Sequence, residues 1–124
     1  MSMFGPITTP ASTGGAGASA ATKVSDRPAV GVVMGIYIQY NDAPPASTDV
    51  GVKTKGQSGV LPSIPIITLT DKNTNGFFVP RTPTYKADGT ADGGYAPFVV
   101  NDYIQIDIAG ANDGDSVSVW LELL

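Results

Sequence analysis

The chain has 124 residues with 15% charged side chains, and 7 Lys and Arg against 11 Asp and Glu give a formal net charge of −4. This length predicts one domain with one core. The absence of His removes the commonest general base and metal ligand, and the absence of Cys excludes disulfides and cysteine-based zinc sites. Without a basic run, neither nucleic acid nor an anionic membrane surface is an expected partner.

The composition also argues against catalysis. Glu122 is the only glutamate, and the aspartates are scattered without a recognisable acid–base pair. No apolar run approaches the ~18 residues of a membrane span, and the first residues lack the pattern of a signal peptide. We therefore predict that the protein is not an enzyme and that it needs no cofactor or metal.

Residues 1–27 differ in composition from the rest of the chain. After a start that contains Phe4, Pro6 and Ile7, the tract at 11–21 consists only of Ala, Ser, Thr and Gly. Such a tract buries little apolar surface and predicts an extended N-terminal arm, separate from a β domain at 28–124. The arm is either a disordered tail or a segment that lies along a partner subunit. In the second case Phe4, Pro6 and Ile7 are the expected anchors.

The first strong strand signal lies at residues 29–40. Apolar side chains recur there at every second position, the period of a strand with one buried face. On the opposite face, Gly31 and Gly35 predict a bulge or a close approach of another backbone. The side chains expected in the core are Val30, Val32, Met34, Ile36, Ile38 and Tyr40.

Shorter strand signals follow, separated by residues typical of turns. They lie at 50–55, 64–70 and 77–79. A long loop is expected at 81–94, with a short strand around Tyr85 as an alternative, and residues 95–100 lead from it into the final segment. Phe77 and Phe78 are both expected in the core, at the end of a hairpin.

Residues 102–124 contain the clearest alternation in the chain. Two period-two segments flank a connection rich in Gly, Asn and Asp, which predicts a β-hairpin with one apolar face. No segment shows helical periodicity. The fold class is therefore all-β, a small antiparallel sandwich, jelly roll or barrel of six to eight strands with the N-terminal arm extended from it. The expected core residues of the hairpin are Ile104, Ile106, Ile108, Val117, Val119, Leu121 and Leu123.

Trp120 is the only tryptophan, and strict alternation places it on the face opposite Val119 and Leu121. Either a second layer or a loop buries it, or it is exposed for a sugar or a neighbouring subunit. Tyr37 could share its face and add a second aromatic ring. The outer face at Trp120 and the chain end at Leu124 are the expected contacts with a partner.

Two motifs have weaker functional interpretations. Asp71, Asn73, Asn75 and Gly76 match the first half of a calcium loop, but Thr82 stands where a bidentate Glu is required, so an ordinary turn is favoured. The glycines at 14–17 lack the strand and helix of a phosphate-binding loop.

The final segment, NDYIQIDIAGANDGDSVSVWLELL at 101–124, together with the small-residue N-terminal tract, resembles small virion proteins of tailed bacteriophages, most closely the head decoration (cement) proteins. The resemblance implies a structural protein on the outer capsid surface, made in the host cytoplasm. It implies a dimer or trimer that bridges major capsid protein subunits, often through a terminal arm. Many weak contacts would then hold it through multivalency.

Two alternatives to capsid decoration remain open. The first is a carbohydrate- or receptor-binding β module that uses Trp120 and tyrosines. The second is another phage component, from the tail or baseplate.

Overall fold

The computed structural model describes all 124 residues and contains only β-strands, which confirms the all-β prediction. There are more strands than the six to eight expected, because residues 1–27 and 81–97 each contribute two. The strands are β1 (Ser2–Thr8), β2 (Ser19–Val24), β3 (Ala29–Asn41), β4 (Asp49–Thr54), β5 (Pro65–Leu69), β6 (Gly76–Phe78), β7 (Arg81–Tyr85), β8 (Ala91–Pro97), β9 (Val99–Asp102), β10 (Ile104–Ala111) and β11 (Ser116–Leu123).

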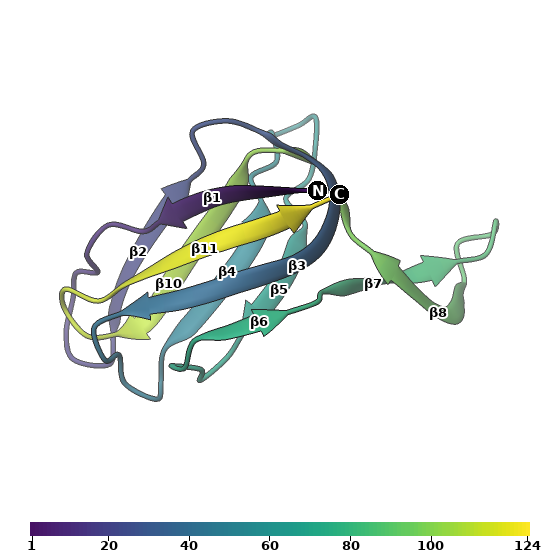
Figure 1. Ribbon diagram of the computed structural model, residues 1–124. Coiled ribbons are helices and arrows are strands. Elements are labelled where there is room, and N and C mark those ends of the chain that lie inside the picture. Colours follow the sequence, from purple (N-terminus) through teal and green to yellow (C-terminus); the bar gives the residue numbers. More distant parts are fainter.

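Two antiparallel sheets face each other as a sandwich (Figure 1). The first sheet has the order β1-β11-β3-β6, with β9 also paired to β3, and the second has the order β2-β10-β4-β5. The two chain ends lie side by side at one end of the sandwich, where Ser2 is paired with Leu123 (Figure 1). No helix is present that could cross a membrane.

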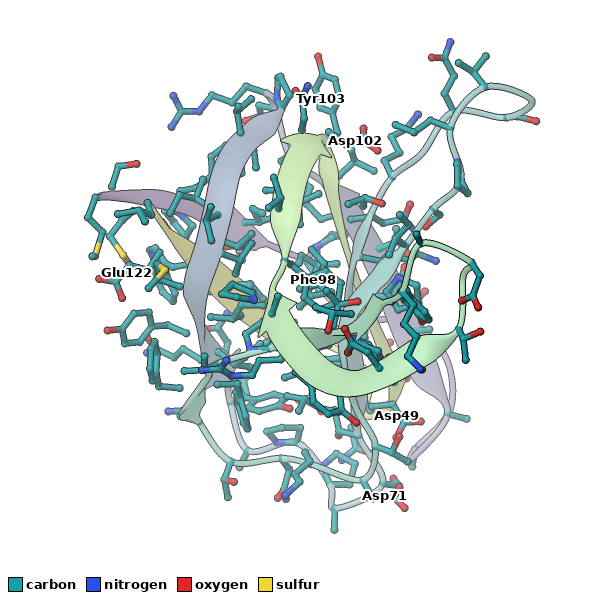
Figure 2. The ribbon with its side chains drawn as sticks, turned by 90° about the vertical axis from the view of Figure 1, so that its right-hand side faces the viewer. Asp49, Asp71, Phe98, Asp102, Tyr103 and Glu122 are labelled. Carbon is teal, nitrogen blue, oxygen red and sulfur yellow. The ribbon has the colours of Figure 1, made fainter.

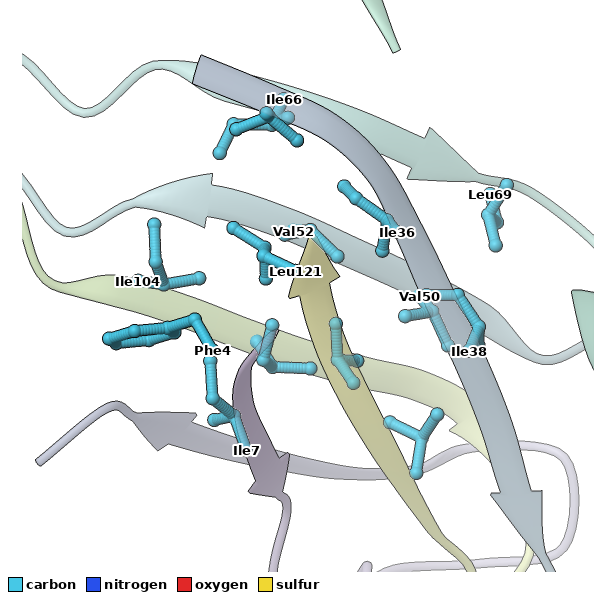
Figure 3. Close-up of a cluster of buried hydrophobic side chains, with 14 of the residues drawn as sticks. Phe4, Ile7, Ile36, Ile38, Val50, Val52, Ile66, Leu69, Ile104 and Leu121 are labelled. Atoms are coloured by element: carbon cyan, nitrogen blue, oxygen red, sulfur yellow. The ribbon is translucent and has the colours of Figure 1, made fainter. Parts of the chain in front are cut away.

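The inner faces of the two sheets form one hydrophobic core of 20 buried residues (Figure 3). Ile104, Ile106 and Ile108 of β10 come from one sheet, and Val119 and Leu121 of β11 from the other. All are almost inaccessible to solvent, as the alternation predicted. Burying such a side chain contributes roughly 1.5–3 kcal/mol, which explains how the domain is stable without disulfides.

The predicted hairpin at 102–124 is wrong in its pairing, although its strands and core residues are correct. β10 hydrogen-bonds with β2 and β4, whereas β11 hydrogen-bonds with β1 and β3. The turn between them therefore crosses from one sheet to the other. This arrangement buries each apolar face against the other, whereas a hairpin would place both faces side by side and leave them needing a cover.

The predicted N-terminal arm is also wrong. β1 pairs with β11 and β2 pairs with β10, so residues 1–27 supply an edge strand to each sheet. Phe4 and Ile7 lie in the core of their own chain, with 7% and 4% of their surface exposed. Small side chains do not prevent strand formation, because the backbone hydrogen bonds of the ladder do not depend on them. The β domain thus spans the whole chain rather than 28–124.

Strand β3 follows the predicted alternation only in its second half. Ile36, Ile38 and Tyr40 are buried, but Val30 is exposed. The register with β11 shifts between Glu122 and Leu123, and the first residues of β3 pair with β9 instead. The bulge therefore places the side chains that precede it in β3 on the faces opposite to those predicted.

The loop predicted at 81–94 is wrong in part, because the structure has strand β7 ending at Tyr85, where a short strand was an alternative, and also strand β8 from Ala91. β7 and β8 form a separate two-stranded ribbon that projects from the sandwich (Figure 1). Tyr85 and Tyr95 are both exposed on it.

Candidate functional site

Three aromatic side chains lie in one row across the outer face of the first sheet. Trp120 of β11 is paired with Tyr37 of β3, and Tyr37 is paired with Phe77 of β6. Directly paired residues of adjacent strands carry their side chains on the same face. We call Trp120, Tyr37 and Phe77 the aromatic strip.

The rings of the strip are accessible to a ligand. Tyr37 and Phe77 are 41% and 48% exposed, and Trp120 is half-buried. The ring centroids of Tyr37 and Phe77 are 4.5 Å apart, with an angle of 44° between the ring planes. This contact holds the two rings against each other and reduces the conformational freedom that binding would otherwise remove.

Gly35 provides the space for the Phe77 ring. A Cβ at this position would overlap the Phe77 ring atoms Cε1 and Cζ. The sequence predicted a close approach at Gly35, but the approaching group is a side chain and not a backbone. A glycine on an otherwise apolar strand therefore helps to place a surface aromatic ring.

A shallow depression of about 470 Å³ runs beside the strip. Its walls are partly apolar and include two side-chain amides, those of Gln39 and Asn75. The Asn75 Oδ1 accepts a 2.8 Å hydrogen bond from the Tyr40 backbone N–H, which fixes this side chain and leaves its NH₂ group available. The lining residues are Met3, Tyr37, Ile38, Gln39, Asn75, Gly76 and Trp120.

Glu122 lies next to the strip on the same outer face. It is two residues beyond Trp120 on β11, and its paired residues are Met3 on β1 and Gly35 on β3. Since the Phe77 ring covers Gly35, the Glu122 side chain is a cross-strand neighbour of that ring. The carboxylate forms no ion pair, because both salt bridges of the chain involve other residues. Figure 2 shows Glu122 at this face, on the left of the view.

The outer face of the second sheet has a different character, because its polar groups bind one another. The Thr22 hydroxyl donates a 2.6 Å hydrogen bond to Asp107, the Gln105 amide donates to the same carboxylate, and Lys53 Nζ lies 3.3 Å from it. Partial burial disfavours the Asp107 charge, but these three partners outweigh it and hold the pKa of Asp107 below its usual value. The polar side chains of this network are therefore already paired with one another.

The anchors predicted at the N-terminus do not form a site together. Phe4 and Ile7 are buried in the core, and Pro6 is exposed on the edge strand. The Arg27 guanidinium carbon lies 5.1 Å from the centroid of the Phe4 ring, so the ring is covered by its own chain. Leu124 is 66% exposed beside β3 and away from the strip row. Of the predicted contacts, Trp120 is the one that lies in the strip.

The residues of the possible calcium loop have structural roles in turns. Asn73 donates a 3.0 Å hydrogen bond to the Pro44 carbonyl oxygen, and Asn75 accepts from Tyr40. Elsewhere, the backbone N–H of Thr90 lowers the pKa of Asp88, and the hydroxyl of Thr84 lowers that of Asp92. No three acidic side chains come together as metal ligands.

Phe77 is the aromatic residue of the strip that the sequence pattern did not predict, and Gln39, Asn75 and Glu122 were likewise not predicted as site residues. Phe77 was expected in the core together with Phe78, but only Phe78 packs against the core. Consecutive residues of a strand point to opposite faces, so one of two adjacent phenylalanines had to lie outside. Strict alternation was the signal that could have identified it.

No family model matches the chain, and no curated protein matches it. Its similarity to solved structures is distant. The CBM32 of AlyQ in complex with 4,5-unsaturated mannuronic acid is 10% identical with a TM-score of 0.47, and the alignment covers 98% of each chain. A pectin-binding carbohydrate-binding module is 13% identical with a TM-score of 0.39, covering 86% of this chain and 68% of that one. A chitosan-binding module from Paenibacillus sp. IK-5 is 14% identical with a TM-score of 0.41, covering 96% and 76%.

Proposed function

We propose that the protein is a non-catalytic carbohydrate-binding module and that the aromatic strip is its binding surface. The observation that carries this proposal is the row of Trp120, Tyr37 and Phe77 across three adjacent strands, in which Tyr37 and Phe77 are exposed and Trp120 is half-buried. A sugar ring has an apolar face of C–H groups that packs on an aromatic ring, and hydroxyl groups at its edge that need hydrogen-bond partners. The strip offers the rings, and Gln39 and Asn75 offer amides at its border.

The shape of the site favours a chain of sugars over a single small molecule. The depression is open along the sheet, and the three rings follow one another across the strands, which are ~4.8 Å apart. The row from β11 to β6 therefore spans roughly 10 Å. That span is suited to two consecutive sugar rings. Each stacking contact would add modestly to the binding free energy.

The proposal is tested with a glycan array, followed by titration of the bound glycan. Trp120 is the only tryptophan, so a change in its fluorescence reports binding at the strip itself. Phe77→Ala should weaken binding at least tenfold, which corresponds to about 1.4 kcal/mol. Tyr85→Ala is the matched control, because it removes an exposed aromatic side chain from the ribbon, away from the strip. Equal affinity of wild type and Phe77→Ala would refute the proposal.

A virion role, expected from the resemblance to decoration proteins, is a second proposal. The projecting β7–β8 ribbon favours it, because an isolated two-stranded ribbon is marginally stable and gains from a partner. In this proposal the ribbon, and not residues 1–27, would contact a neighbouring capsid or sister subunit. Sedimentation of the intact protein at micromolar concentration tests the expected dimer or trimer. A monomer at that concentration would count against an oligomeric clamp.

A further inference from the structure

The charge around the aromatic strip distinguishes between classes of sugar. Glu122 is paired with Gly35, which the Phe77 ring of the strip covers, and the residues that line the depression include no Lys or Arg. From these residues, and resting on the proposed carbohydrate-binding function, we infer that the strip prefers sugars that carry a protonated amine over neutral sugars and uronic acids. Amino-sugar oligomers with free amines are the ligand class.

The aromatic rings and the Glu122 carboxylate both attract positive charge. The face of an aromatic ring carries partial negative charge and attracts a cation within about 6 Å of its centroid. The Glu122 carboxylate adds a full negative charge beside the Phe77 ring, since Glu122 is paired with the glycine that this ring covers. An ammonium group placed between them would be attracted by both. A uronic acid carboxylate in the same position would be repelled by both.

Glu122 is also free to take a new partner. By contrast, the Asp107 carboxylate on the outer face of the second sheet already has three partners, Thr22, Gln105 and Lys53. The Glu122 side chain makes neither a hydrogen bond nor an ion pair within the chain, and the residue is half-buried. Its side-chain stem is therefore packed while its charge remains unpaired, which suits it to a charged ligand.

The test compares two oligomers of equal length, one of glucosamine and one of N-acetylglucosamine, at a pH at which the free amine is protonated. Wild type should bind the glucosamine oligomer about fivefold more tightly, the effect of one ion pair in a water-exposed position. Glu122→Gln keeps the shape of the side chain and should abolish this preference. It should change the affinity for the acetylated oligomer less than twofold.

Asp113→Asn is the matched control, because it makes the same change in net charge on an exposed turn residue. Asp113 precedes the start of β11, and Glu122 lies six residues beyond that start, roughly 20 Å along the strand. The control should retain the preference. Raising the salt concentration should reduce the preference of wild type, since exposed charge pairs are screened.

The outcomes separate this inference from the proposed function. If wild type binds both oligomers equally, or if Glu122→Gln keeps the preference, the inference is wrong while the carbohydrate-binding function stands. If neither these oligomers nor any glycan of the array binds, both proposals are wrong. If Asp113→Asn loses the preference as Glu122→Gln does, the effect is one of net charge, and the role of Glu122 is refuted.

Discussion

The two outer faces of the sandwich are built from the same kind of strand, yet they differ in what they leave unsatisfied. On the second sheet, Asp107 binds Thr22 and Lys53 from the two neighbouring strands and Gln105 from its own strand, so its charge is matched. On the first sheet, the aromatic strip presents ring surface to water, and Glu122 beside it has no partner. A face that already satisfies its groups gains little from a ligand. The unsatisfied face is therefore where binding should occur.

The largest effect on stability is expected in the hydrophobic core, because both sheets pack on it. Leu121 is fully buried on β11, between Trp120 and Glu122, so it anchors the strand that carries half of the site. Leu121→Ala should lower the free energy of unfolding by about 2–5 kcal/mol, measured by urea denaturation. Leu124→Ala is the control, because this exposed residue should change stability by less than ~0.5 kcal/mol. A comparable loss in both variants would contradict the assignment of the core.

A smaller effect is expected at the glycine beneath the strip. Gly35→Ala should cost about 1–3 kcal/mol of stability and weaken glycan binding, because the new methyl group displaces the Phe77 ring. Gly51 lies on β4 of the other sheet, where an added Cβ meets no atom within 4 Å. Gly51→Ala should therefore be neutral or slightly stabilising. Denaturation and titration of both variants check the difference, and unchanged binding by Gly35→Ala would contradict it.

On the polar face, Asp107→Asn should reduce stability by less than ~1 kcal/mol at neutral pH, because the carboxylate is partly exposed. Its folded pKa lies below the usual 3.8, so its contribution is present above that value. The contribution is lost as the pH falls through the folded pKa. Unfolding free energies at a series of pH values should show the two proteins converging in acid. A constant difference down to pH 2 would contradict this account, and glycan binding should not change.

The smallest effect is expected at Tyr40, whose buried hydroxyl has no hydrogen-bond partner. Tyr40→Phe should leave stability unchanged or slightly raised at neutral pH. Burial, assisted by the charge of Asp49, raises the pKa of Tyr40 from 10.0 to about 12. Ionisation is therefore easier in the unfolded chain, so stability is lost as the pH rises from 10 toward 12. Tyr40→Phe should lose less stability over this range, and identical alkaline denaturation curves would contradict the expectation.

Local patterns in the sequence predicted the strands and much of the core, because alternation depends only on which side chains face inward. The pairing of strands was harder to predict. The turn after β10 could equally have formed a hairpin, and the difference arises from the burial of two apolar faces against each other. The small-residue tract at 11–21 carried no signal that its neighbours Phe4 and Ile7 were core residues of the same chain.

The candidate site was predicted in part for a related reason. Alternation placed Trp120 and Tyr37 on outer faces, but only the register of β11 with β3 brings them into one row. Phe77 joins them because β6 pairs with β3 over three residues, a contact between segments far apart in the sequence. The charge of Glu122 was visible in the sequence, whereas its position beside the Phe77 ring depended on the glycine that faces it.

The most direct test of the central claim is nuclear magnetic resonance mapping of the bound glycan on the intact protein. The largest chemical-shift changes are expected at the Trp120 indole N–H and at the side-chain amides of Gln39 and Asn75. Signals of Thr22, Lys53 and Asp107 on the opposite face should not move. Changes that centre on that polar face or on the β7–β8 ribbon, with the Trp120 signal unaffected, would contradict the account.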